Sequence, residues 1–583
     1  MSEVAYRIDL MQRHAHLYTV EALFPAKGAT LELKLPLWTP GSYLIREFER
    51  HLQDLTCEDS DGQKLPVTKV DKATWRVETR GVGRVRARYR VYAWDLTVRS
   101  AHLDDTHGFW NGACVFLYAE GQSALPARVT VIPPAGWKVT VGLDADANDP
   151  LTFRADSYDT LVDSPFECGT HEVLEFSAQG KRHRLAIWGR VETPREQLSG
   201  DFQRIIDAAQ GVFGDPLPYP DYTFLLMVAP NQYGGLEHSR SCALLASPFT
   251  FAPRKKYEEF LELVSHEFFH LWNVKRIHPD MLGPFDYQRE AYTRSLWVME
   301  GVTSYYDRYL LVRAGLKDPK SYLEKLAEEI GKIAAIPGRF RQSLEESSFD
   351  AWIKLYRPDE NSVNSTISYY LKGGVVALLL DLEIRSRTEG RRTLDDVMRL
   401  LWQRHGKSGQ GFADGALQAL VEEASGIRLD EFFARNVRGR EELDCNPLLR
   451  TVGLELKIGG DEEDEKTREV WLGCTFKDNG DTVLIASALD GGPATASGLY
   501  AQDEIIALDN FRVDLAGLKE RLATRKAGDQ VTLTLFRRDE LRTVVATLAD
   551  KPPEKYEIVP VAKPSDAQRA AYLAWLGKPF PTD

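Results

Sequence analysis

Two histidines four residues apart, with a glutamate directly after the first, form the most chemically specific pattern in the chain. They are His266, Glu267 and His270, within the segment Leu261–Asn273. On an α-helix, side chains four positions apart lie on one face with Cβ atoms about 5–6 Å apart, so both imidazoles can bind one metal ion. The glutamate lies beside the pair, where it can reach a water held by the metal. The pattern therefore indicates an H-E-x-x-H zinc site.

A catalytic zinc site has three protein ligands and leaves one position for water, so a third ligand is expected after His270. Glu300 is the preferred candidate, because the chain between them is long enough for one helix to end and a second to return. Glu290 is the nearest alternative; it lies at the start of that second helix, where an acid also suits the helix dipole. Asp307, two turns after Glu300, is expected either to orient a zinc histidine or to pair with a nearby arginine.

Such a site would hold one zinc ion per chain and would lower the pKa of a water to about 7. Glu267 would take the proton from that water as it attacks a carbonyl, and would return a proton to the leaving amine. The oxyanion that forms needs a hydrogen-bond donor besides zinc. Tyr370, in the segment 368–374, is the candidate, with an ordinary aromatic residue at a helix start as the alternative.

Composition favours a soluble multidomain protein. The chain has 583 residues, more than one hydrophobic core supports, so three or four domains are expected. A net charge of −13 argues against a nucleic-acid partner. The six cysteines include no C-x-x-C pair and indicate reduced, buried thiols. No signal peptide is visible, and apolar runs such as Val375–Leu380 are too short to span a membrane, so we expect a cytoplasmic protein, or a periplasmic one if a leader was removed.

The pattern of apolar residues changes along the chain. Residues 1–190 hold short alternating segments between Gly, Pro and Asp clusters, which predicts an all-β, sandwich-like domain. Its stretch Pro36–Arg46 is expected to be a packed loop at a corner, with a role facing the active-site cleft as the alternative. The middle of the chain predicts helices over 195–213, 257–274 and 290–313, strands from 222 and 242, and a glycine-bearing loop over 231–238.

The last third of the chain is first helical and then rich in strands. Residues 336–450 are mostly helical, and residues 451–552 form a compact β-rich region. Within that region, the acidic run Asp461–Glu465 is expected to be a solvated loop. The amphipathic segment Ser565–Leu576 lies in a tail, 553–583, that we expect to pack back on the body.

Several motifs resemble known metallopeptidases. The histidine pair with a downstream Trp-x-x-Glu300-Gly is similar to the gluzincins, and Gly234-Gly235-Leu-Glu237-His238 resembles the G-x-M-E-N exopeptidase loop of aminopeptidase N-like enzymes. Tyr370-Leu-Lys-Gly resembles their Y-E-K-G motif, whose tyrosine stabilises the transition state.

Two departures from that pattern narrow the resemblance. The spacing from His270 to Glu300 is longer than is usual in the aminopeptidase N family, and His238 stands where an asparagine is expected. With Pro40-Gly-Ser-Tyr43 and a PDZ-like module near the C-terminus, these features resemble the glycyl aminopeptidase family.

The resemblance implies a multidomain α+β fold and release of N-terminal glycine or alanine from peptides with a free N-terminus. Glu237 would bind the cationic α-amine, Gly234 and Gly235 would let the backbone approach the substrate, and His238 belongs to the same substrate-binding loop. Leu472 and Gly473 would hold the C-terminal carboxylate of a peptide at the PDZ domain. The implied domains are an N-terminal β-domain (1–190), a thermolysin-like zinc catalytic domain (191–335), an α-helical domain (336–450), a PDZ domain (451–552) and a C-terminal tail (553–583).

Two alternatives stay open at this point. The first is a zinc aminopeptidase of broader specificity, or a zinc endopeptidase. The second belongs to another class, a PDZ-bearing peptide-binding scaffold with a vestigial site. The presence of His266, Glu267, His270 and Glu300 together argues against the scaffold.

Overall fold

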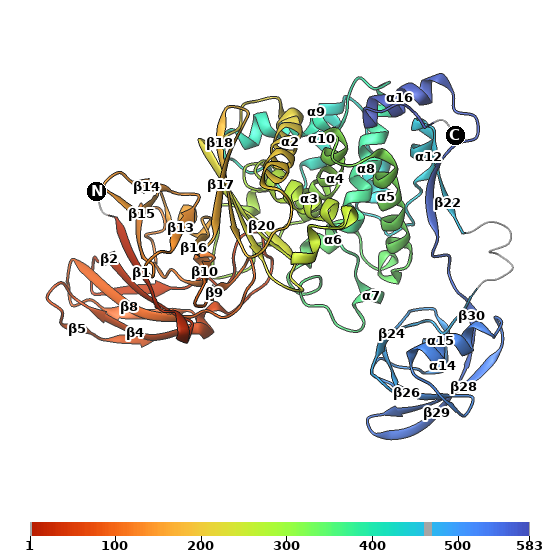
Figure 1. Cartoon of the computed structure of the whole chain (residues 1–583), viewed down its shortest axis with the longest axis horizontal. Coiled ribbons are helices and arrows are strands. Elements are labelled where there is room, and N and C mark those ends of the chain that lie inside the picture. Colours follow the sequence, from red (N-terminus) through yellow and green to blue (C-terminus); the bar gives the residue numbers. More distant parts are fainter. Residues whose placement is uncertain (1–2, 460–468, 582–583) are drawn as a thin grey trace. The chain divides into compact units, whose positions relative to one another are not determined.

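The computed structural model describes residues 3–459 and 469–581 (Figure 1). The chain divides into two compact units, each made of several segments. The first comprises Met1–Thr293, Tyr306–Lys317 and Asp395–Leu417; the second comprises Arg294–Tyr305, Asp318–Leu394 and Gln418–Asp583. The acidic run 461–465, for which the sequence predicts a solvated loop, lies outside the described residues. Over the described ranges, every helix is too short or too polar to cross a membrane.

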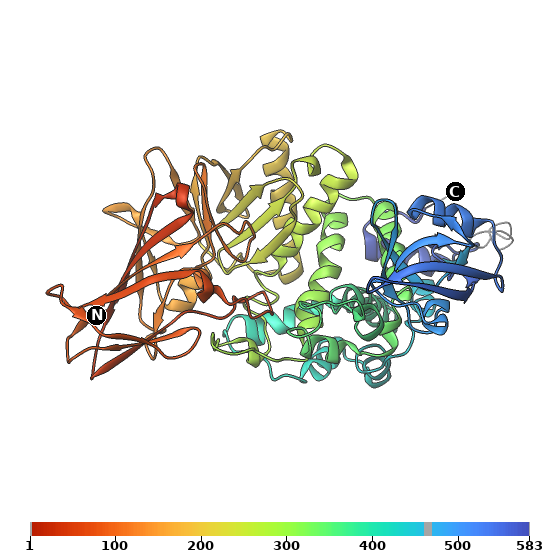
Figure 2. The same ribbon diagram turned by 90° about the horizontal axis from the view of Figure 1, so that it is seen from below.

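Three sheets fill the N-terminal part of the first unit, drawn in red to orange in Figure 2, as expected for an all-β domain. The largest has the order β14-β15-β12-β1-β2-β8-β4-β5. In β8 every second residue is buried, as a sheet with one face on a core requires. The strands are β1 (Val4–Gln12), β2 (Leu17–Pro25), β3 (Thr30–Lys34), β4 (Leu52–Glu58), β5 (Lys64–Leu65), β6 (Val67–Lys69), β7 (Thr74–Glu78), β8 (Arg84–Tyr92), β9 (Ala101–Leu103), β10 (His107–Trp110), β11 (Tyr118–Ala119), β12 (Ala127–Ile132), β13 (Lys138–Val141), β14 (Asp144–Asp146), β15 (Asp149–Ala155) and β16 (Phe166–Gly169).

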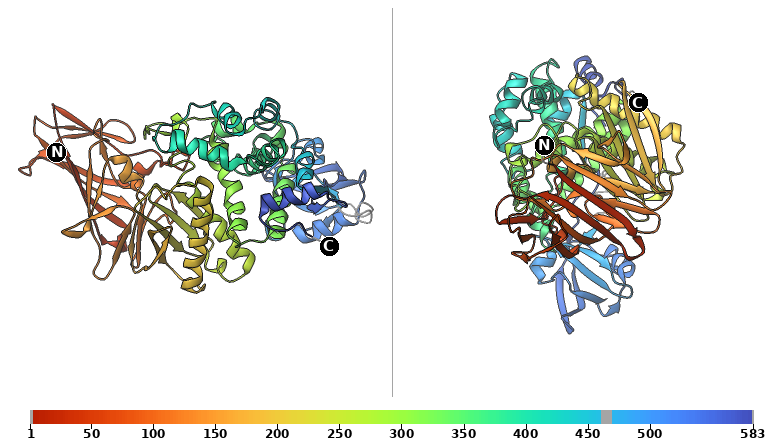
Figure 3. Two further views of the ribbon diagram at one scale, coloured as in Figure 1. Left: turned by 90° about the horizontal axis from the view of Figure 1, so that it is seen from above. Right: turned by 90° about the vertical axis from the view of Figure 1, so that its left-hand side faces the viewer.

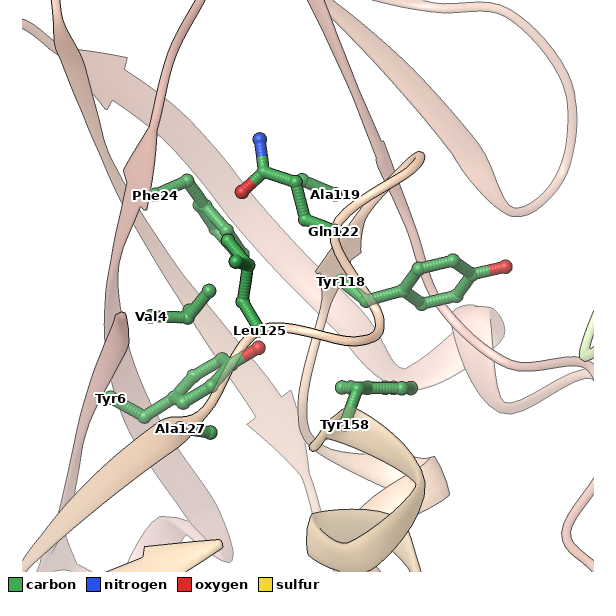
Figure 4. Close-up of a pocket in the computed structure, with 9 residues that line it drawn as sticks. All are labelled: Val4, Tyr6, Phe24, Tyr118, Ala119, Gln122, Leu125, Ala127 and Tyr158. Carbon is green, nitrogen blue, oxygen red and sulfur yellow. The ribbon is translucent and has the colours of Figure 1, made fainter. Parts of the chain in front are cut away.

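Buried tyrosines in the core of these sheets donate hydrogen bonds to backbone carbonyl groups. Tyr6 Oη donates to the Leu117 carbonyl at 2.7 Å, and Tyr158 Oη donates to the Phe116 carbonyl at 2.6 Å. The buried phenols are therefore satisfied. Figure 4 shows both rings, with Phe24, around a cavity of about 10 Å³, a packing gap no larger than one water molecule needs.

A five-stranded mixed sheet follows, with the order β17-β18-β19-β21-β20. The middle strands β18, β19 and β21 run parallel, and the two edge strands pair antiparallel to their neighbours. This sheet includes β17 and β18, which lie before residue 190, the domain boundary expected from the sequence. The sequence of a short strand does not show which sheet the strand joins. Its strands are β17 (Glu172–Ala178), β18 (Lys181–Trp188), β19 (Asp221–Val228), β20 (Gly234–Glu237) and β21 (Ser241–Ala246).

Two helices, α2 (Arg195–Phe213) and α3 (Arg254–Phe269), pack against this sheet and each other (Figure 1). Tyr257 Oη of α3 donates to Asp201 Oδ2 of α2 at 2.8 Å. The prediction for α2 is confirmed. The prediction of a helix through Val274 is wrong beyond Phe269, because Val274 has a φ of 119°, which no helix allows.

The predicted helix from Glu290 also starts later than expected. Residues 290–295 are not helical, and the first helical hydrogen bonds run from the N–H groups of Val298 and Met299 to the Ser295 carbonyl. The helix opens with a π-helical turn, η6 (Trp297–Val302), and continues as α4 (Thr303–Arg313). Such wide turns inside helices occur frequently at functional sites.

In the second unit, η6 lies against helix α8 at a contact between two glycines. A Cβ on Gly301 would lie 2.6 Å from Gly373 Cα, so only glycine permits this approach. The contact fixes the turn that carries Glu300 against the start of the helix that follows Tyr370. The other helices of this unit are α5 (Pro319–Ala334), α6 (Leu344–Phe349), α7 (Ser362–Ser365), α8 (Leu371–Arg387), α10 (Leu417–Ser425), α11 (Asp430–Asn436) and α12 (Asn446–Leu449), whereas α1 (Tyr158–Val162) and nearly all of α9 (Leu394–Leu401) belong to the first unit.

The C-terminal β-rich region is drawn in blue in Figure 3. Its sheet has the order β24-β25-β26-β28-β29 with β27 on β26. The tail helix α16 (Asp566–Leu576) starts at a capping box and packs within the second unit, where Trp575 Nε1 donates to Tyr305 Oη at 3.3 Å. The other elements are β22 (Leu454–Ile458), β23 (Val470–Trp471), β24 (Cys474–Asp478), β25 (Val483–Ala488), α14 (Pro493–Ser497), β26 (Glu504–Leu508), β27 (Phe511–Arg512), α15 (Leu515–Ala523), β28 (Gln530–Arg537), β29 (Glu540–Thr547), β30 (Ala549–Asp550) and β31 (Tyr556–Pro560).

The glycine contact predicts a stability effect. Gly301→Ala should destabilise the protein by about 1–3 kcal/mol, because the added methyl group meets backbone atoms that cannot yield. Gly200→Ala in α2 is the matched control: nothing lies within 4 Å of its added Cβ, and it should stabilise by about 0.5–1 kcal/mol. Thermal unfolding of both variants measures the difference. Equal midpoints would show that the contact between the two glycines does not constrain the fold.

Candidate functional site

Helix α3 places the two histidines and the glutamate of the H-E-x-x-H pattern at its C-terminal end. The His266 and His270 ring centroids lie 4.6 Å apart at an interplanar angle of 85°. His270 is 1% exposed and Glu267 is 5% exposed, while His266 is half-buried. The two imidazoles therefore share one face of the helix end, as the four-residue spacing predicts.

Both histidines use Nδ1 for a hydrogen bond to the protein. His270 Nδ1 lies 2.7 Å from the Asn273 carbonyl, so this nitrogen carries the proton. His266 Nδ1 lies 3.1 Å from Asp307 Oδ2, whose other oxygen is 3.8 Å from Arg308 Nε. Asp307 thus makes both contacts that the sequence left as alternatives. With the proton on Nδ1, the lone pair of each ring is on Nε2, the nitrogen that would bind a metal, and an acceptor at Nδ1 raises the basicity of a ligating histidine.

Two groups of side chains bring possible metal ligands together. One ligand atom from each of His266, His270 and Glu300 lies within 4.8 Å of the others, and the same holds for Glu237, Glu267 and His270. Glu300 comes from the π-helical turn η6 and is 2% exposed. Glu290 belongs to neither group. Two imidazole nitrogens and one carboxylate oxygen are the donor types of a catalytic zinc site, so the residues present fit that ion.

The segment expected to be a glycine-bearing loop contains an edge strand instead. Gly234, Gly235 and Glu237 lie on β20, which pairs with β21 on one side and ends the sheet on the other. A Cβ on Gly235 would lie 2.0 Å from Glu267 Oε1. Glu267 can therefore lie directly against the strand because Gly235 has no side chain.

Glu237 carries a buried carboxylate at the end of β20 and is 4% exposed. Within residues 3–459 and 469–581, this carboxylate forms neither a hydrogen bond nor an ion pair. Gly41, from the turn-rich N-terminal stretch, packs directly on it: a Cβ on Gly41 would lie 2.5 Å from Glu237 Oε1. The stretch Pro36–Arg46 thus reaches the candidate site, as the alternative interpretation of this stretch predicts.

His238 follows Glu237 and turns toward a different set of partners. Its Nδ1 lies 3.1 Å from Asp163 Oδ1, and the same oxygen accepts from Lys275 Nζ at 2.6 Å. Burial opposes ionisation of Asp163, yet the Lys275 ammonium and the His238 ring hold the pKa of this carboxyl below its ordinary value. The structure therefore places His238 in a buried polar network with Asp163 and Lys275.

Tyr370 directly precedes α8 in the second unit. Its hydroxyl lies 3.1 Å from the Tyr356 hydroxyl, and its ring stacks on Tyr369 with centroids 4.7 Å apart. Burial and the negative charge of Glu300 raise the pKa of Tyr370 well above its ordinary value. The hydroxyl therefore stays protonated and can donate a hydrogen bond.

In the C-terminal β-rich region, Leu472 and Gly473 immediately precede β24. Leu472 is 1% exposed, and Gly473 has a φ of 74° that favours glycine. A hollow beside β24 is lined by Leu472, Phe476 and Leu522, and also by Ile336 and Phe340 from the segment after α5. β24 is an edge strand of its sheet, and PDZ domains bind an extended peptide by adding it as a strand at such an edge.

Comparisons with known proteins match three parts of the chain to known domains. The Peptidase M61 N-terminal domain matches residues 5–170, M61 glycyl aminopeptidase matches residues 259–376, and a PDZ domain matches residues 470–548. The second match contains His266, His270, Glu300 and Tyr370. No curated protein matches the chain.

Solved structures give a match over nearly the whole length. An aminopeptidase N family protein from Idiomarina loihiensis is 35% identical, with a TM-score of 0.92, covering 98% of this chain and 100% of that chain. An M1 zinc metallopeptidase from Deinococcus radiodurans is 14% identical, with a TM-score of 0.47, covering 76% of this chain and 95% of that chain.

The hydrogen bond between Asp307 and His266 predicts an effect on metal affinity. Asp307→Asn should weaken zinc binding by about 10- to 100-fold, because the amide is a poorer partner for the His266 N–H. Competition with a chelator of known affinity measures the change. Asp286→Asn, in an exposed ion pair with Arg289, is the control and should leave the affinity unchanged. Unaltered zinc affinity in Asp307→Asn would contradict the role given to this contact.

Proposed function

The chain belongs to the M61 glycyl aminopeptidase family and is a zinc aminopeptidase with a PDZ domain, and we propose that it releases small N-terminal residues, glycine or alanine, from peptides. The observation that carries the proposal is the buried carboxylate of Glu237, which lies beside Glu267 and His270 without an ionic partner. A substrate with a free N-terminus brings the missing positive charge.

Glu237 is proposed as the anchor for the substrate's α-amine. A buried charge without a partner is costly, and a charged ammonium group would offset that cost through a charge-assisted hydrogen bond. Internal peptide segments lack this ammonium group and would leave the carboxylate buried and unpaired. The arrangement therefore favours removal of residues from the N-terminus over cleavage inside a chain.

We propose that His266, His270 and Glu300 hold one zinc ion per chain. Their donor set and proximity fit this ion, and the acceptors at both Nδ1 atoms fix the histidine tautomers that ligation requires. When bound, zinc polarises the scissile carbonyl and makes water more acidic.

Glu267 is the proposed general base. Its carboxylate lies against the backbone of Gly235, so a peptide that runs along β20 brings its N-terminal bond toward this group. Glu267 would accept the proton of the attacking water and return it to the departing amine. Tyr370, which stays protonated, would donate its O–H to the developing oxyanion.

The proposed preference for small residues follows from what surrounds Glu237. Glu237 lines a cavity of about 10 Å³ together with Trp38, Pro40, Gly41, Tyr43 and Phe285. A space of this size holds about one water molecule. A hydrogen atom or a methyl group next to the anchored amine fits such a space, whereas a leucine or phenylalanine side chain does not.

The PDZ domain is proposed to bind the C-terminal segment of a peptide or protein by strand addition at β24. The backbone before β24, at Leu472 and Gly473, would hold the terminal carboxylate. This site is separate from the proposed catalytic residues in sequence.

Acetylation of the substrate tests the role of Glu237. Alanine p-nitroanilide should be hydrolysed, and its N-acetyl derivative should not, because acetylation removes the charge that Glu237 pairs with. Glycine, alanine and leucine p-nitroanilides compared in the same assay test the size preference, with leucine the slowest. Hydrolysis of the acetylated substrate at an equal rate would contradict the proposed function.

The close contact between Gly235 and Glu267 predicts that a side chain at position 235 displaces the general base. Gly235→Ala should retain zinc and lose turnover by about 100-fold or more, since the added methyl group displaces Glu267, whose removal as a base costs a comparable factor. Glu267→Gln should give the same phenotype. Gly234→Ala, whose added Cβ meets only Arg99 Nη1 at 3.7 Å, should lose much less. Metal content and kcat on alanine p-nitroanilide distinguish these cases, and equal kcat in both glycine variants would refute the explanation.

A further inference from the structure

We propose that Arg99 binds the C-terminal carboxylate of short peptides, so that the enzyme prefers dipeptides and tripeptides with a free carboxylate. The proposal rests on the proposed function, since it takes Glu237 as the anchor for the amine. It adds a second charged contact at the other end of β20 and names the class of substrate: short zwitterionic peptides.

The guanidinium of Arg99 reaches the edge strand from the loop before β9. Arg99 Nη2 donates to the Gly235 carbonyl at 3.0 Å, and Nη1 lies 3.7 Å from the position of a Cβ on Gly234. Nε is buried without a hydrogen-bond partner. No carboxylate pairs with this side chain anywhere in the part of the chain that the structure describes.

An arginine without an anionic partner is unusual beside a site lined by carboxylates. The planar guanidinium offers five N–H donors that match a carboxylate well, and one of them is used on Gly235. Its backbone is held in place: the Arg99 N–H donates to Thr97 Oγ1 at 3.1 Å, and the Arg99 carbonyl accepts from Cys114 Sγ at 3.3 Å. The side chain is thus positioned for a ligand that carries negative charge.

The spacing along β20 sets the length of that ligand. Because the Gly235 carbonyl accepts from Arg99, it points away from β21 and toward the open edge of the sheet. A strand rises about 3.4 Å per residue, so the backbone at Gly235 lies about 7 Å from that at Glu237. An extended peptide spans about 3.3–3.6 Å per residue, so two or three residues separate an amine at Glu237 from a carboxylate at Arg99.

The direction of the peptide agrees with this assignment. A substrate with its amine at Glu237 and its later residues toward Gly235 and Gly234 runs antiparallel to β20. Antiparallel addition to an open edge strand is a common mode of peptide binding. The negative anchor for the amine and the positive anchor for the carboxylate then lie at opposite ends of one short strand.

The test compares a dipeptide with its amide. Wild-type enzyme should hydrolyse Ala-Gly with a kcat/KM about 10- to 100-fold above that for Ala-Gly-amide, the value of one hydrogen-bonded charge pair. Arg99→Gln should abolish this difference, mainly through KM, and change the hydrolysis of alanine p-nitroanilide, which has no carboxylate, by less than about threefold. Arg99→Lys keeps the charge and should retain part of the preference.

Arg154→Gln is the matched control, because this exposed arginine on β15 pairs with Asp146. It should leave all three substrates unchanged. Equal rates on dipeptide and amide in the wild type, or an equal loss on all three substrates in Arg99→Gln, would overturn the proposal and leave Arg99 as a structural contact of β20. Absence of alanine release from every substrate by the wild type would instead contradict the proposed function, and with it this inference.

Discussion

Two buried carboxylates next to His270 impose the main electrostatic constraint on this protein. Glu237 and Glu267 place ligand atoms within 4.8 Å of each other and of that histidine, and both side chains are almost completely shielded from water. Like charges at this distance in a poorly solvated site repel strongly. Positive charge from a metal ion and from a substrate ammonium group would offset the repulsion between the two carboxylates. The proposed chemistry and the proposed specificity both follow from it.

The carboxylates of the site also depend on a close approach of the backbone, which three glycines permit. Gly235 leaves the space that Glu267 occupies, Gly41 leaves the space that Glu237 occupies, and Gly301 lets the turn carrying Glu300 approach α8. At each of these positions a methyl group would meet atoms at 2.0–2.6 Å. The carboxylates of the proposed site are thus held by contacts with the main chain as much as by contacts with other side chains.

Local pattern allowed much of this arrangement to be predicted from sequence. The four-residue spacing of His266 and His270 predicts their shared helix face, and Glu300 emerges from the requirement for a third ligand. The limits of the helices were less predictable: apolar periodicity continues to Val274, although the helix ends at Phe269, where the chain must turn. Contacts between distant segments left no signal at all. Arg99 and Gly235 are 136 residues apart, and no periodicity connects a loop of one sheet with the edge strand of another.

The early end of α3 has an electrostatic consequence for the metal site. Aligned peptide dipoles give the C-terminal end of a helix the equivalent of about half a negative charge. His270 is the C-cap residue and His266 lies one turn before it, so both imidazoles stand in the field of the last carbonyl groups of the helix. That field favours a cation between the rings before any ligand bond is counted. A helix continuing to Val274 would move its negative end away from the histidines and weaken this contribution.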